Sequence, residues 1–167
     1  KKILISFFIL TLFYNCDTSD DDCFENKSVA YFTQKKIRSY SKQLQPVVEG
    51  NNIVFTYNEG KGCQNSPDSN SHESLFFEID PQNNLRATKN NEEVTSFSFI
   101  NDEITLIKGY YTTFNPWNPS FSSLVNKGKI EGEKVSDQKW EITVNIEIIT
   151  PDNTSKFLVF TRVYILQ

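Results

Sequence analysis

The sequence predicts a single all-β domain, and three observations support this prediction. Aromatic residues make up 14% of the chain, with 14 Phe and 7 Tyr, while Met is absent; aromatic side chains favour strands over helices. Short apolar runs are separated by turn-forming clusters, and no stretch keeps the period of a long helix. We therefore expect a single antiparallel β-sandwich of about eight or nine strands, with an eight-stranded lipocalin-like barrel as the alternative.

The most regular strand predicted by the sequence spans residues 140–148. Apolar and polar residues alternate there without a fault, which is typical of a strand with one buried and one wet face. The residues expected to face the core are Trp140, Ile142, Val144, Ile146 and Ile148. Residues 74–80 alternate in the same way. Residues 157–166 are largely apolar on both faces, which predicts a strand inside the sheet or covered on both sides.

The remaining strands are shorter and are delimited by turn clusters. We expect them over residues 29–33, 36–44, 53–57, 85–88, 94–100, 104–112 and 127–134. The turn Asn101-Asp102-Glu103 predicts that residues 94–112 form a hairpin. Residues 58–73 are rich in Gly, Ser and Asn, and they predict a long polar loop. Two prolines interrupt residues 114–119, which predicts a second loop.

The first residues of the chain have the features of an export signal. Lys1 and Lys2 precede an apolar run over residues 3–14. As a helix, a run of about a dozen residues is too short to cross the ~30 Å hydrocarbon core of a bilayer. A positive flank and a short apolar run are typical of a signal peptide, which we expect over residues 1–15.

Cys16 follows the apolar run and is itself followed by the acidic stretch Asp17-Thr18-Ser19-Asp20-Asp21-Asp22. This arrangement resembles the signals of bacterial lipoproteins and, more narrowly, those of the surface-exposed lipoproteins of the Bacteroidetes group. The resemblance implies that Cys16 is lipidated, that residues 16–28 form a tether, and that a domain over residues 29–167 is anchored in the outer membrane at the cell surface. Asn15 departs from the small residues that the family has before its Cys, so an ordinary secretion signal or an uncleaved tether remains the alternative.

Cys23 and Cys63 are the other two cysteines, and an exported protein meets an oxidising compartment. We expect them to form a disulfide, which would close a loop worth on the order of 4 kcal/mol in the chain-entropy model. A metal site would need more ligands than these two thiols and the single His72, and there is no Cys-x-x-Cys spacing. We therefore expect no metal and no cofactor.

Charge and motifs exclude several classes of function. The formal net charge of −4 and the pI of about 5.1 make a nucleic-acid partner unfavourable. His72 lies in the predicted polar loop without a Gly-x-Ser-x-Gly elbow, so we interpret it as an exposed loop residue rather than a catalytic one. Carboxylates for glycoside hydrolysis are present, but only their separation in space could identify a catalytic pair. They are Glu73, Glu78, Asp80, Asp102 and Glu103.

Phe114 and Trp117 are the best candidates for ligand-binding residues. Aromatic side chains held by neighbouring prolines could stack on a sugar ring or anchor a surface protein partner; the alternative is that they fold back over the end of the core. The sequence therefore predicts a non-catalytic binding or structural domain that meets the membrane through its N-terminal lipid, with a glycan hydrolase as the alternative.

Overall fold

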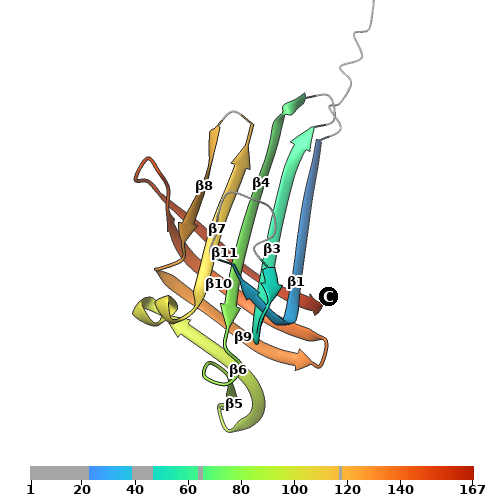
Figure 1. The fold of residues 1–167 in the computed structure, drawn as a ribbon, viewed down its shortest axis with the longest axis vertical. Coiled ribbons are helices and arrows are strands. Elements are labelled where there is room, and N and C mark those ends of the chain that lie inside the picture. Colours follow the sequence, from blue (N-terminus) through green and yellow to red (C-terminus); the bar gives the residue numbers. More distant parts are fainter. Residues whose placement is uncertain (1–22, 39–46, 64–65, 117) are drawn as a thin grey trace, which may run out of the picture.

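The computed structural model describes residues 23–38, 47–63, 66–116 and 118–167. Within these ranges the chain forms strands and one short 3-10 helix, arranged as a curled sheet (Figure 1). The strands are β1 Cys23–Ile37, β2 Val47–Glu49, β3 Asn52–Cys63, β4 Ser66–Ile79, β5 Arg86–Lys89, β6 Glu92–Ile100, β7 Lys108–Asn115, β8 Asn118–Leu124, β9 Gly128–Ser136, β10 Lys139–Ile149 and β11 Ser155–Leu166, and the helix is η1 Asn101–Leu106.

The strands form one continuous sheet in the order β5-β6-β9-β10-β11-β1-β3-β4-β7-β8, and β2 pairs with β1. Neighbouring strands are antiparallel except for β1 and β11, which run parallel where Ala30 meets Ile165 and Tyr31 meets Leu166. This short contact joins the two halves of a half-barrel. The prediction of an all-β fold is confirmed. The two-sheet antiparallel sandwich is not, because the described strands form a single mixed sheet.

Aromatic side chains on the inner face of the sheet form the core. Phe55 on β3 is at its centre, with ring centroids 4.9 Å from Phe77 and 5.7 Å from both Trp140 and Tyr164. These rings come from strands on both sides of the β1/β11 contact, so the core ties the two halves together. On β10, the predicted alternation is confirmed: Trp140, Ile142, Val144, Ile146 and Ile148 are all buried.

Strand β11 lies inside the sheet, between β10 and β1, as its apolar sequence predicted. Its outer face is nevertheless open, because Phe157 and Val159 are 64% and 67% exposed. The position of β11 inside the sheet therefore agrees with its apolar sequence. Nothing among the described residues covers Phe157 and Val159.

The predicted hairpin over residues 94–112 is wrong. Residues 101–106 form η1, and β6 pairs with β5 and β9 while β7 pairs with β4 and β8. Ile104 and Ile107 are both buried, and a spacing of three residues places two side chains on the same side of a 3-10 turn. These two apolar anchors hold the chain against the core as it crosses from one half of the sheet to the other.

The predicted polar loop over residues 58–73 is also wrong, because β3 continues to Cys63 and β4 begins at Ser66. Likewise β1 begins at Cys23, so residues 23–28, which we expected in the tether, belong to the sheet and pair with β3. Both faces of these strand ends are polar, so the apolar alternation that identifies a strand is missing there. Residues 39–46, which include most of the strand predicted over residues 36–44, lie outside the described residues.

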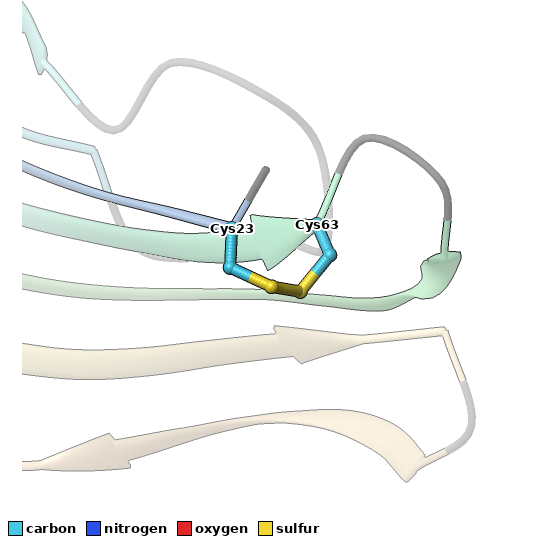
Figure 2. Close-up of a disulfide and its surroundings, with 2 residues drawn as sticks. All are labelled: Cys23 and Cys63. Carbon is cyan, nitrogen blue, oxygen red and sulfur yellow. A yellow bond between two sulfur atoms is a disulfide. The ribbon is translucent and has the colours of Figure 1, made fainter. Parts of the chain in front are cut away.

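The predicted disulfide is present between Cys23 and Cys63 (Figure 2). The two residues are direct partners in the β1/β3 pairing, with their Cα atoms 3.9 Å apart. The bond therefore holds the ends of two neighbouring strands together. Cys16 and the rest of residues 1–22 lie outside the described residues.

Candidate functional site

The ends of β1, β3, β4, β7 and β8 rise together beyond the strands that cross behind them (Figure 1). We call this part of the sheet, residues 23–28, 58–63, 70–74, 112–115 and 120–122, the projecting end. Both of its faces carry polar side chains. The two faces differ sharply in charge.

The inner face of the projecting end is charged, and its charges are paired. Lys27 lies opposite Glu59, which lies opposite Glu73 on the next strand. Lys61 Nζ is 2.7 Å from Glu59 Oε1, and Lys27 Nζ is 3.8 Å from the same oxygen. Glu73 forms an ion pair with Lys156 of β11. This face therefore neutralises its own charges.

Glu59 is held in its ionised form. Burial raises the pKa of this carboxyl, but hydrogen bonds from Lys61 and from the hydroxyl of Tyr57 outweigh burial and lower the pKa to about 2. A general acid in glycoside hydrolysis needs a raised pKa so that it carries a proton near neutral pH. Glu59 and Glu73 are neighbours on adjacent strands, but Glu59 cannot serve as the acid of such a pair.

The other carboxylates predicted as candidates have separate structural roles. Glu78 accepts a hydrogen bond from the backbone N–H of Ile37. Asp80 accepts bonds from Gln82 and Asn83, which organise the turn after β4 and lower the pKa of Asp80.

Asp102 and Glu103 occupy the first turn of η1, where both are exposed. The structure therefore does not assemble a catalytic carboxylate pair from the predicted residues that it describes.

The outer face of the projecting end carries no charged side chain among the described residues. The strand register aligns two rows of side chains across it. The first, which we call the hydroxyl–amide row, consists of Ser28, Asn58, Ser74, Thr112 and Ser122. The second, which we call the Gly60 row, consists of Asn26, Gly60, His72 and Phe114. Neutral hydrogen-bonding groups thus lie beside two rings.

His72 belongs to strand β4 and not to a loop, although it is exposed as predicted. Its Nε2 atom lies 3.1 Å from Ser74 Oγ, and Ser74 Oγ donates a hydrogen bond to Asn58 Oδ1 at 2.8 Å. The Ser74 hydroxyl is therefore already engaged by Asn58. Ser74 is also only 3% exposed, so these residues do not form a nucleophile.

Phe114 is 55% exposed and lies directly opposite His72 in the β4/β7 pairing. It does not fold back over the core. The predicted loop over residues 114–119 is instead the tip of a hairpin, because β7 ends at Asn115 and β8 begins at Asn118. Trp117, the other predicted aromatic, lies outside the described residues.

The Gly60 row was not predicted from the sequence, although the sequence contains a signal for it. Charged residues at 59, 61 and 73 alternate with uncharged ones at 58, 60, 72 and 74. A period of two between charged and neutral polar residues indicates a strand whose faces are both wet. This period was overlooked because strands are usually identified by an alternation of apolar and polar residues.

Other features of the described residues do not suggest a different site. No three His, Cys, Asp or Glu side chains in the described ranges are grouped so that they could hold a metal ion. A shallow polar pocket beside β5 contains Glu131 and Glu133, but each of these pairs with a lysine. None of the described helices is long and apolar enough to cross a membrane.

Comparisons of the chain with protein-family models, with curated proteins and with solved structures found no match.

Proposed function

We propose that this protein is a cell-surface lipoprotein whose single β-domain binds a ligand and catalyses no reaction. In this proposal Cys16 carries the lipid that anchors the protein in the outer membrane, and the acidic residues after it direct the protein to the cell surface. The ligand is a glycan or a surface protein, the domain needs no cofactor, and nucleic acid is not a partner.

The observation that supports a binding role most strongly is the position of Phe114. A large aromatic side chain that stays half exposed, opposite a second ring, offers contact area at a small cost in conformational entropy. The hydroxyl–amide row beside it offers donors and acceptors that fix a ligand's orientation. A hydrolase is disfavoured because Glu59 is ionised and the Ser74 hydroxyl is buried and bonded to Asn58.

The anchoring half of the proposal is tested by mass spectrometry of the N-terminus of the protein isolated from its native membrane. We expect the N-terminal residue to be Cys16 carrying acyl chains. An unmodified N-terminus at any other residue would contradict the lipoprotein assignment.

The binding half is tested with the soluble domain on arrays of glycans and surface proteins, together with a panel of ester and glycan substrates. We expect binding without turnover, and we expect Phe114→Ala to weaken it. Val159→Ala is the matched control, because Val159 is an exposed apolar residue on β11, outside the projecting end. Turnover of any substrate, or equal binding by both variants, would overturn this half of the proposal.

A further inference from the structure

Gly60 is a glycine that the fold does not require. The chain has six glycines, and at five of them an added Cβ would come within about 3 Å of another atom or the backbone is otherwise constrained. At Gly128, for example, a Cβ would lie 2.3 Å from the backbone oxygen of Asn145, and at Gly132 it would lie 2.3 Å from the ring of Phe97. At Gly60, among the described residues, the Cβ would meet only His72 Nδ1, at 3.6 Å, which is an ordinary contact.

The backbone of Gly60 does not explain the glycine either. Gly128 is the described glycine with positive φ, so Gly60 has a conformation open to any residue. Glycine inside a strand costs stability relative to residues with side chains, and it often marks a bulge, a bend, or a place where a ligand or another backbone approaches closely. Gly60 pairs regularly with Asn26 on one side and with His72 on the other, so it does not mark a bulge. The absence of a side chain at position 60 therefore points to an occupant.

The surroundings of Gly60 indicate what that occupant is. Asn26 on β1 and His72 on β4 lie on either side of it, and Phe114 lies beyond His72. The neighbouring row is made of hydroxyl and amide groups, and the projecting end's charges lie on its other face, where they are paired with one another. A ligand that fits is flat enough to lie on bare backbone, rich in hydroxyl groups, and uncharged.

We infer that the bare backbone at Gly60 is the subsite for one ring of an uncharged polysaccharide. In this arrangement a sugar ring lies over Gly60, its apolar face or edge contacts the rings of His72 and Phe114, and its hydroxyl groups bond to Asn26 and Asn58. The inference rests on the proposed function, since it assigns the ligand class of the same surface.

The test fills the subsite without disturbing the fold. Gly60→Val adds a β-branched residue in a strand, and its Cβ would make an ordinary contact of 3.6 Å with His72 Nδ1, so we expect the melting temperature to equal or exceed that of the wild type. The probes are soluble starch, xylan and galactomannan as neutral polysaccharides, with polygalacturonate and hyaluronan as acidic ones, each cast into a native gel. We expect a neutral polysaccharide to retard the wild type, and Gly60→Val to weaken the affinity roughly two- to tenfold, as loss of one ring contact would.

The outcomes separate the inference from the proposed function. The protein could bind an acidic polysaccharide or a protein, with binding weakened by Phe114→Ala and unchanged by Gly60→Val. That result would overturn the inference and leave the proposed function standing. Retardation by none of the three neutral polysaccharides would also overturn the inference. Neutral binding that Gly60→Val leaves unchanged, while that variant remains folded, would place the sugar elsewhere.

Discussion

Replacing Ile146 with alanine tests the orientation of β10, and with it the division of the sheet into a buried and a wet face. Ile146 is fully buried and lies opposite Leu158 on β11 and Gly128 on β9. The substitution removes three carbon atoms, worth about 0.8 kcal/mol each in lost burial, and it leaves a cavity. We therefore expect Ile146→Ala to lower the free energy of unfolding by roughly 2 to 5 kcal/mol.

Asn145→Ala is the matched control, because Asn145 is the preceding residue and its side chain is exposed on the outer face. We expect this variant to stay within about 0.5 kcal/mol of the wild type. Urea denaturation monitored by the fluorescence of the buried Trp140 measures both values, provided that the slopes with urea agree. Equal losses for the two variants would mean that β10 is covered on both faces and would refute the half-barrel's wet outer surface.

Three further predictions concern single groups. Replacing Cys23 and Cys63 by serine should lower the free energy of unfolding by up to about 4 kcal/mol, and adding reductant to this variant should not lower it further. Free alkylation of both thiols in the oxidised native protein would show that the bond is absent. The pKa of Glu59 is lowered from 4.5 to about 2, so its contribution to stability is full above pH 4.5 and is lost as the pH falls towards 2. Acid titrations of unfolding should therefore be less steep in Glu59→Gln than in wild type, and identical curves would count against the ion pairs. Tyr31→Phe should lower the free energy of unfolding by about 1 kcal/mol, because the Tyr31 hydroxyl donates a hydrogen bond to the backbone oxygen of Asp137 at 2.9 Å. Tyr164→Phe should be neutral or stabilising, because the Tyr164 hydroxyl is buried and has no hydrogen-bond partner among the described residues. Denaturation curves in the opposite order would contradict this prediction.

The sequence was informative wherever a strand has one apolar face. Residues 74–80 and 140–148 were predicted correctly because apolar side chains that alternate along each strand build the core. The same reasoning failed at residues 58–63 and 70–73, where both faces are polar and hydrogen bonding between strands, together with the disulfide, replaces apolar burial.

Long-range pairing was the other part that the sequence did not reveal. Nothing local indicates that β1 meets β11 in parallel, because that contact depends on how the two halves of the sheet meet around Phe55. Likewise, η1 was predicted as a tight turn because Asn101-Asp102-Glu103 favours one, whereas burial of Ile104 decided the outcome.

The candidate site was predicted only in part, for the same physical reason. Phe114 was identified because an aromatic residue close to two prolines can be recognised in the sequence. His72 and Gly60 were not, because their roles arise from the register that places them beside Phe114 across three strands.

If the outer face around Gly60 binds the ligand as we propose, His72 lies at the binding site and reports on it directly. It is the single histidine of the chain, so its imidazole C–H signals form an isolated and unambiguous set in an NMR spectrum. The measurement is a titration of labelled protein with oligosaccharides from whichever neutral polysaccharide retards it. We predict that the His72 signals shift until they reach saturation, and that the dissociation constant from this titration equals the one measured in the gels. Saturable binding that leaves the His72 signals unmoved would show that the sugar binds away from Gly60.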